Sequence, residues 1–354
     1  MPDQPNTTFR DGIRLATRDA MAADPSVICT GLGVTDPGGV FGTTSGLLAD
    51  FGPDRVFDGP TSENAMTGVG VGAALAGLKP LMSHQRLDFF LLAMDQLVNS
   101  AAKWHYMFGG HVAVPLTIRL VIGRGWGQGP THSQNYQAWF AHVPGLKVVA
   151  PAYPRDAYGL LRASIEDPNP VVFLEHRWLH NAVGDLTPDE VSGSLDHARM
   201  CREGGDITIC ASGLLTLEAI KAADWLASHG VFCDVIDLRT LNPLDWTTIF
   251  SSVSKTGRLV AVDSAAMTGS LAGEIVARIA TDGYSILRSA PVRVAQPDIP
   301  EPTSHGLTKG FHVDARDIAE AVLTNLEIPV AADIEDLCGP QPHDVPGPWF
   351  SGPF

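Results

Sequence analysis

The stretch LKVVAPAYPRDAYGLLRASIEDPNPVVFLEHR, residues 146–177, contains a strand, a helix and a second strand in one continuous run. Its two outer segments are apolar almost throughout, and the segment between them is helix-like. Strands that are apolar on both faces are typical of parallel sheets covered by helices on both sides. The stretch therefore predicts an α/β fold with a parallel sheet.

The same alternation extends in both directions from this unit. Upstream, strand-like runs such as VICTGLGV, KPLMSH and VPLTIRLVIG alternate with helical segments, and a second alternation runs from DITICASG to PVRVAQPD. A chain of 354 residues exceeds the size at which one hydrophobic core stops growing. We expect two three-layer αβα domains, with boundaries at residues 1–187, a polar linker at 188–204, a second domain at 205–328 and a Pro/Gly-rich tail at 329–354. The tail is expected to lie along a surface or a partner without regular structure.

Composition excludes several classes of function. The formal net charge of −15 disfavours nucleic acid and anionic membranes as partners. Five cysteines without close paired spacing argue against a disulfide framework or a zinc site, and no apolar run is long enough to span a membrane. The N-terminus lacks the pattern of a secretory signal, so we expect a cytoplasmic protein.

Glu63 begins a run of very small residues in FDGPTSENAMTGVGVGAALAG, residues 57–77. The run suggests a helix that lets another backbone approach closely. On position alone, Glu63 either interacts with the positive end of this helix or carries chemistry.

Two other segments contain candidate functional residues. His132 follows the Gly-rich loop RGWGQGP, which is neither a phosphate-binding loop nor a dinucleotide fingerprint. Its neighbour Ser133 is not a convincing nucleophile, because no G-x-S-x-G elbow exists. Phe89 lies where a strand-like segment becomes a helix, and its ring either completes the core or stacks on a planar ligand.

Taken in order, five segments resemble the beta subunit of the thiamine-diphosphate-dependent decarboxylating component of 2-oxo acid dehydrogenase complexes. The resemblance covers residues 8–328 and is carried by GGVFGTTSGLLADFGPDRVFDGPTSENAMTGVGVGAALAG, DFFLLAMDQLVNSAAKWHYMFGG, THSQNYQAWFAHVPGLKVVAPAYPRDAYGLL, DPNPVVFLEHR and CDVIDLRTLNPLDWTTIFSSVSKTGRLVAV. It implies a pyrimidine-binding domain followed by a transketolase C-terminal-like domain.

The resemblance also implies roles for individual residues. Glu63 matches the glutamate that hydrogen-bonds the cofactor's aminopyrimidine and thereby activates the cofactor. Phe89 matches the aromatic residue that stacks on that ring. We also expect Gln85 to bind the cofactor. His132 matches the histidine on the substrate side, which Gln134 is expected to hold.

Further expectations concern a cation and the substrate. A loop of oxygen ligands at Ser164, Ile165, Asp167 and Asn169 aligns with a potassium site of some relatives, although a plain turn explains the same residues. His84 and Arg86 depart from the family pattern. They form either a surface pair or, together with Gln134, a substrate-binding group, because Arg recognises carboxylates and phosphates.

The chain contains no Gly-Asp-Gly segment, the family's magnesium and diphosphate motif. The resemblance therefore implies an alpha subunit that holds Mg²⁺ and the diphosphate, an α2β2 heterotetramer, and a lipoyl acyltransferase as a further partner. The alternative is a split transketolase-like or carboligating enzyme that uses the same cofactor on a sugar or aldehyde without a lipoyl carrier.

Overall fold

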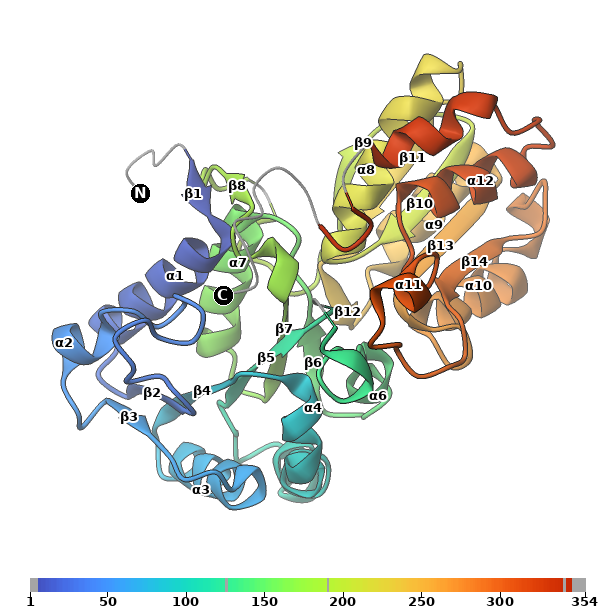
Figure 1. Cartoon of the computed structure of the whole chain (residues 1–354). Coiled ribbons are helices and arrows are strands. Elements are labelled where there is room, and N and C mark those ends of the chain that lie inside the picture. Colours follow the sequence, from blue (N-terminus) through green and yellow to red (C-terminus); the bar gives the residue numbers. More distant parts are fainter. Residues whose placement is uncertain (1–5, 125–126, 190, 340–341, 346–354) are drawn as a thin grey trace.

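The computed structural model describes residues 6–124, 127–189, 191–339 and 342–345. These residues form two α/β units that lie side by side, each built around one sheet with helices on both faces (Figure 1). The predicted fold class, two three-layer αβα domains, is confirmed.

The first unit contains a seven-stranded sheet in the order β12-β6-β7-β5-β4-β2-β3, in which only β12 is antiparallel to its neighbour. Its strands are β2 (Val27–Gly31), β3 (Val56–Asp58), β4 (Lys79–His84), β5 (Thr117–Ile122), β6 (Lys147–Val149), β7 (Val171–His176) and β12 (Thr240–Asn242). A separate two-stranded ribbon pairs β1 (Thr7–Thr8) with β8 (Val183–Gly184).

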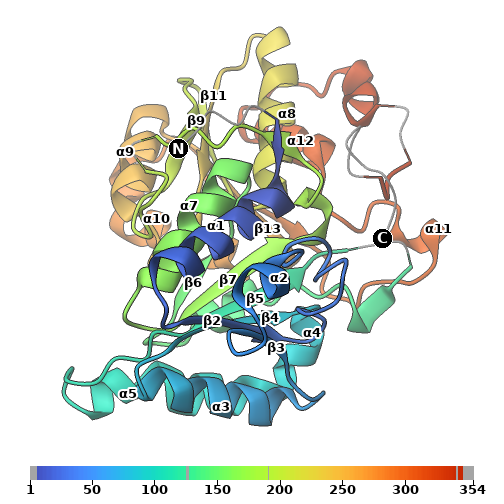
Figure 2. The same cartoon turned by 90° about the vertical axis from the view of Figure 1, so that its left-hand side faces the viewer.

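Helices cover both faces of this sheet (Figure 2). On one face α1 (Phe9–Ala23) packs on α7 (Pro154–Glu166), and on the other lie α3 (Glu63–Leu75) and α5 (Ala102–Met107). In β7, Val172 and Leu174 belong to the core beneath α3, whereas Val171 and Phe173 belong to the core beneath α1. This alternation explains why the strand is apolar along most of its length: each face of the sheet is buried.

The second unit has a five-stranded sheet in the order β14-β13-β10-β11-β9, which is parallel apart from β9. The strands are β9 (Arg199–Arg202), β10 (Ile207–Ala211), β11 (Cys233–Asp237), β13 (Leu259–Ala266) and β14 (Val292–Gln296). Its helices are α8 (Leu214–Ser228), α9 (Trp246–Thr256), α10 (Leu271–Asp282) and α12 (Ala315–Asn325). Gly257 ends α9 with φ +73°, the left-handed conformation that glycine adopts without strain.

Four features differ from the simplest sequence expectation. The expected linker contains β9, and β12 leaves the second unit to join the first sheet. The helical segment expected to begin at Phe89 is divided into α4 (Leu87–Phe90), η1 (Leu91–Ala93), the π-helical η2 (Gln96–Ala101) and α5. Within the expected irregular tail, η6 (Ala332–Cys338) is helical, while residues 346–354 lie outside the described residues.

Short elements complete the chain: α2 (Leu47–Phe51), η3 (Gly129–Thr131), α6 (Gln137–Ala141), η4 (Arg177–Leu179), η5 (Tyr284–Ile286) and α11 (His305–Thr308).

The two units share one hydrophobic core and polar bonds. Phe140 and Val148 of the first unit belong to the same buried cluster as Ile236 and Ile249 of the second. Asp263 accepts a 2.5 Å hydrogen bond from Gln137 across the junction. Among the described residues, every helix is too short or too polar to span a bilayer.

Candidate active site

Three of the predicted site residues lie at the carboxyl edge of the first sheet, where its parallel strands end. Glu63 follows β3, His84 ends β4, and His132 lies in the loop after β5. The strand order reverses next to β2, with β3 on one side and β4 and β5 on the other. In open parallel sheets this edge, at the point of reversal, is where ligands bind.

Glu63 is the first residue of α3, and its side chain is buried, with 6% exposure. The positive end of α3 favours the carboxylate's negative charge. No described residue donates a hydrogen bond to this carboxylate. The carboxylate oxygens are therefore free to accept a hydrogen bond from a ligand.

Phe89 and His132 come together from two different elements. Phe89 lies on α4 with 39% exposure, and its ring meets the half-buried His132 ring edge-on, with centroids 5.2 Å apart and an interplanar angle of 89°. Nδ1 of His132 lies 3.1 Å from the Thr131 hydroxyl. The Phe89 ring therefore presents an accessible apolar surface beside a histidine oriented by its neighbours.

Asp88 links the helix of Phe89 to the loop of His132, and sequence reasoning missed it. One Asp88 carboxylate oxygen accepts from the Gln134 side-chain amide (2.6 Å) and from the Gln134 backbone N–H (3.3 Å). Tyr136 in turn donates to Gln134. The Gln134 side chain is thus engaged by Asp88 and Tyr136, and its expected contact with His132 stays a prediction.

His84 and Arg86 are buried, with 4% and 5% exposure, so the alternative of a surface pair is wrong. Burial lowers the pKa of His84 to about 4, and neither ring nitrogen has a partner among the described residues. Arg86 donates to the carbonyl of Gly123 and to the side chain of Gln128. Arg86 thus connects the end of β4 to the Gly-rich loop. Contact of His84 or Arg86 with substrate stays a prediction.

Gln85 is exposed, and its amide donates to the backbone carbonyl of Leu32 at 3.3 Å. This bond joins the loops after β4 and β2, the two strands that flank the point of reversal. The role of Gln85 in cofactor binding stays a prediction.

Glu301, in the loop after β14, reaches this region from the second unit. Burial raises the pKa of its carboxyl to about 8, while the neighbouring Arg124 opposes that rise. Its Oε1 lies 3.3 Å from Nε2 of His312. No local sequence pattern marks Glu301, because only the packing of the two units brings it beside the loop of His132.

The loop expected to bind potassium is the end of α7. The Ser164 carbonyl accepts from the Thr117 hydroxyl (2.9 Å), and Asp167 pairs with the ammonium group of Lys147. Ile165 is buried in the core, and the Asn169 backbone donates to Asp167 at 2.9 Å. Lys147 already supplies a positive charge there, and potassium binding stays a prediction.

Gly31, the last residue of β2, lies against the backbone of β4. A Cβ at Gly31 would lie 2.1 Å from the Ser83 carbonyl oxygen. The backbones of β2 and β4 are therefore too close for any side chain at that position.

A narrow cavity between the two units is lined by residues of both, including Arg124, His176, Ser264 and His312. Glu63, Phe89 and His132 do not line it. They lie on a separate face, where Phe89 remains accessible in the single chain.

Comparisons with known proteins agree on both halves of the chain. Residues 6–181 match the transketolase pyrimidine-binding domain, and residues 196–318 match the transketolase C-terminal domain. The mitochondrial pyruvate dehydrogenase E1 component subunit beta-1 of Arabidopsis thaliana is 41% identical over 318 residues, covering 89% of this chain and 88% of the relative. The beta subunit of acetoin:2,6-dichlorophenolindophenol oxidoreductase of Cupriavidus necator is 38% identical over 323 residues, covering 87% and 95%.

Among solved structures, a split-gene transketolase described as an inactive beta4 tetramer superposes with a TM-score of 0.72. It is 22% identical and covers 92% of this chain and 99% of its own. At this identity the likeness shows the fold alone.

Proposed function

Because this chain belongs to the family of beta subunits of the thiamine-diphosphate-dependent decarboxylating (E1) component of 2-oxo acid dehydrogenases, we propose that it supplies the pyrimidine-binding half of such an enzyme. The single observation that carries the proposal is the similarity to curated beta subunits over 89% of the chain. Glu63, whose carboxylate receives no hydrogen bond from a described residue, fits the ring half of the cofactor.

When bound, thiamine diphosphate supplies the nucleophilic carbon and the electron sink for decarboxylation of a 2-oxo acid. We assign Glu63 to share a proton with the aminopyrimidine ring from its buried position. Phe89 offers the face of its ring to the same aminopyrimidine. His132, held through Nδ1, presents its other ring nitrogen for proton exchange with substrate.

The other half of the site comes from an alpha subunit. We propose that this subunit holds Mg²⁺ and the diphosphate in an α2β2 heterotetramer, since the chain has no Gly-Asp-Gly segment. The accessible Phe89 supports a site that a second chain closes. The same proposal includes a lipoyl acyltransferase as acyl acceptor and potassium at the end of α7. It also includes a cytoplasmic location, although the Arabidopsis relative is mitochondrial.

A small 2-oxo acid is the proposed substrate class, since the Arabidopsis relative is named for pyruvate. The Cupriavidus relative is named for acetoin, a small hydroxyketone. The split transketolase alternative receives support only from a fold likeness at 22% identity, against 38–41% for the dehydrogenase subunits.

Reconstitution tests the proposal. The chain is mixed with its cognate alpha subunit, thiamine diphosphate, Mg²⁺, a lipoyl domain and candidate 2-oxo acids, and acyl-lipoyl formation and carbon dioxide release are measured. We expect both activities with the two subunits together and neither with one alone. Ketol transfer to a sugar or aldehyde without lipoyl domain, in the absence of acyl-lipoyl product, would favour the alternative.

A further inference from the structure

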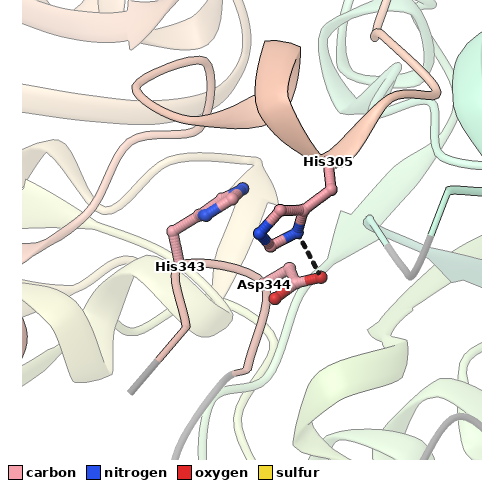
Figure 3. Close-up of side chains that lie close together, drawn as sticks. All are labelled: His305, His343 and Asp344. Atoms are coloured by element: carbon pink, nitrogen blue, oxygen red, sulfur yellow. Dashed lines mark hydrogen bonds and ion pairs between the residues drawn. The ribbon is translucent and has the colours of Figure 1, made fainter. Parts of the chain in front are cut away.

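A cluster of ligating side chains lies outside the candidate active site, where the C-terminal segment 342–345 meets α11. His305 is the first residue of α11, and His343 and Asp344 come from the C-terminal segment. Their ligand atoms all lie within 4.8 Å of one another. Figure 3 shows the two segments side by side with the three side chains converging.

The geometry is close to that of a metal site. Nδ1 of His305 lies 3.1 Å from Oδ2 of Asp344, and the two imidazole rings have centroids 4.3 Å apart. In a tetrahedral site with bonds of about 2.0 Å, neighbouring ligand atoms are separated by about 3.3 Å. The observed 3.1 Å therefore matches one edge of such a tetrahedron without movement of the backbone.

We propose that His305, His343 and Asp344 bind a divalent cation of borderline softness, with Zn²⁺ as the best fit and water completing the coordination. Two imidazoles and one carboxylate are donors that suit Zn²⁺, Co²⁺ and Ni²⁺. Ca²⁺ and Mg²⁺ prefer sets made of oxygen donors alone, so they fit less well.

The side chains around His343 hold its ring and set the local charge. His305, Arg124, Lys309 and Asp344 all lie near this imidazole. The Thr308 hydroxyl, 2.9 Å from Nε2 of His343, holds this ring in place as the outer partners of metal-binding histidines do.

The same surroundings limit the affinity. Arg124 and Lys309 repel a bound cation as well as a proton, and His305 is 64% exposed. Only one carboxylate in the cluster offsets these charges. We therefore expect weaker binding than at a closed site with four protein ligands.

Binding would fasten the C-terminal segment to α11. His305 and Asp344 also line a cavity together with Trp178, Glu301 and His312. Glu301 lies near Ser133, the neighbour of His132. A metal at this site thus fixes one wall of a cavity that adjoins the histidine loop, although it lies apart from Glu63 and Phe89.

The test is a titration of the full-length, metal-free chain. Calorimetry measures the binding of Zn²⁺, and visible absorption spectroscopy measures the binding of Co²⁺. We expect one saturable site per chain and a loss of affinity of tenfold or more in His305→Ala and in His343→Ala. The matched control is His229→Ala, which removes another surface histidine paired with an aspartate, Asp333, and should bind as the unaltered chain does.

Absence of saturable binding would overturn the inference, and so would equal affinity in all three variants, which would indicate adventitious binding only. Circular dichroism of each variant checks that the fold is intact. Slower hydrogen exchange at residues 305–308 and 342–345 on addition of Zn²⁺ is expected as a second readout. None of these measurements uses catalysis, so their failure leaves the proposed function unaffected.

Discussion

At the scale of single residues, two side chains of the candidate site lack a hydrogen-bond partner among the described residues. The carboxylate of Glu63 receives no hydrogen bond, and both ring nitrogens of His84 are buried without a partner. Buried polar groups in proteins are paired in the great majority of cases. Unpaired groups at the carboxyl edge of a parallel sheet are therefore candidates for ligand contact.

Glu63→Gln in the reconstituted enzyme tests the central residue. The amide keeps the size of the side chain but cannot share a proton in the same way, so we expect kcat to fall by about 10²- to 10⁴-fold. Gel filtration should show normal assembly with the alpha subunit. Glu274→Gln, the same change in the first turn of α10, is the matched control and should retain full activity.

Asp88 is expected to act as a positioning residue through Gln134. Asp88→Ala removes the acceptor that links α4 to the histidine loop, and a displacement of about 1 Å near reacting groups costs about 10²-fold in rate. We expect kcat to fall while the cofactor concentration needed for half-maximal activity changes little. Asp88→Asn keeps an acceptor oxygen and should recover most of the activity; no recovery would argue against the positioning role.

At the scale of elements, α3 has two different faces made of small residues. The inner face packs against β4, since a Cβ at Gly70 would lie 2.5 Å from the Met82 sulfur. The outer face is exposed at Val69 and Gly72, and a Cβ added to Gly72 would have no other described atom within 4 Å beyond its own helix backbone. The small residues thus serve internal packing on one face and leave the other face free for a partner chain.

A pair of substitutions separates these two faces. Gly70→Val should destabilise the chain itself by about 1–3 kcal/mol, because it overpacks the contact with β4. Gly72→Leu should leave the unfolding free energy of the chain within about 1 kcal/mol but weaken assembly with the alpha subunit. Urea unfolding and analytical ultracentrifugation measure the two effects. Normal assembly of Gly72→Leu would show that this face lies outside the interface.

At the scale of the whole molecule, the two units are joined by buried charges as well as by the shared core. Asp156 on α7 pairs with Arg199 and Arg239 of the second unit at 2.7 and 2.9 Å. Burial, and then the nearby Asp156, raises the pKa of Asp237 to about 7. The junction therefore contains a carboxyl group that titrates near neutral pH.

This carboxyl predicts how stability depends on pH. Between about pH 4 and pH 7 the folded chain keeps a proton on Asp237 that the unfolded chain has lost, so this group's contribution to stability decreases as pH rises through that range. Asp237→Asn cannot ionise and should flatten the dependence. Thermal unfolding of the chain at pH 5, 6, 7 and 8 measures it, with the exposed Asp224→Asn as control. Identical slopes for Asp237→Asn and the unaltered chain would contradict the prediction.

The α/β class, the order of strands and helices, and the family could all be predicted from the amino-acid sequence alone. These properties are local or nearly so, because the alternation of apolar strands and amphipathic helices follows from period and chain order. Residues 79–84 are predicted as a strand and form β4, and the resemblance singles out Glu63, Phe89 and His132 from their surrounding motifs.

The meeting of distant groups, by contrast, follows from three-dimensional packing. Four features join residues that are far apart in sequence. They are the contact of Phe89 with His132, the hydrogen bond from Gln134 to Asp88, the position of Glu301 beside the loop of His132, and the pairing of β12 with the first sheet. The burial of His84 and Arg86 likewise depends on packing. No local pattern encodes such pairs, because their geometry is set by how two sheets and their connecting loops pack into one core.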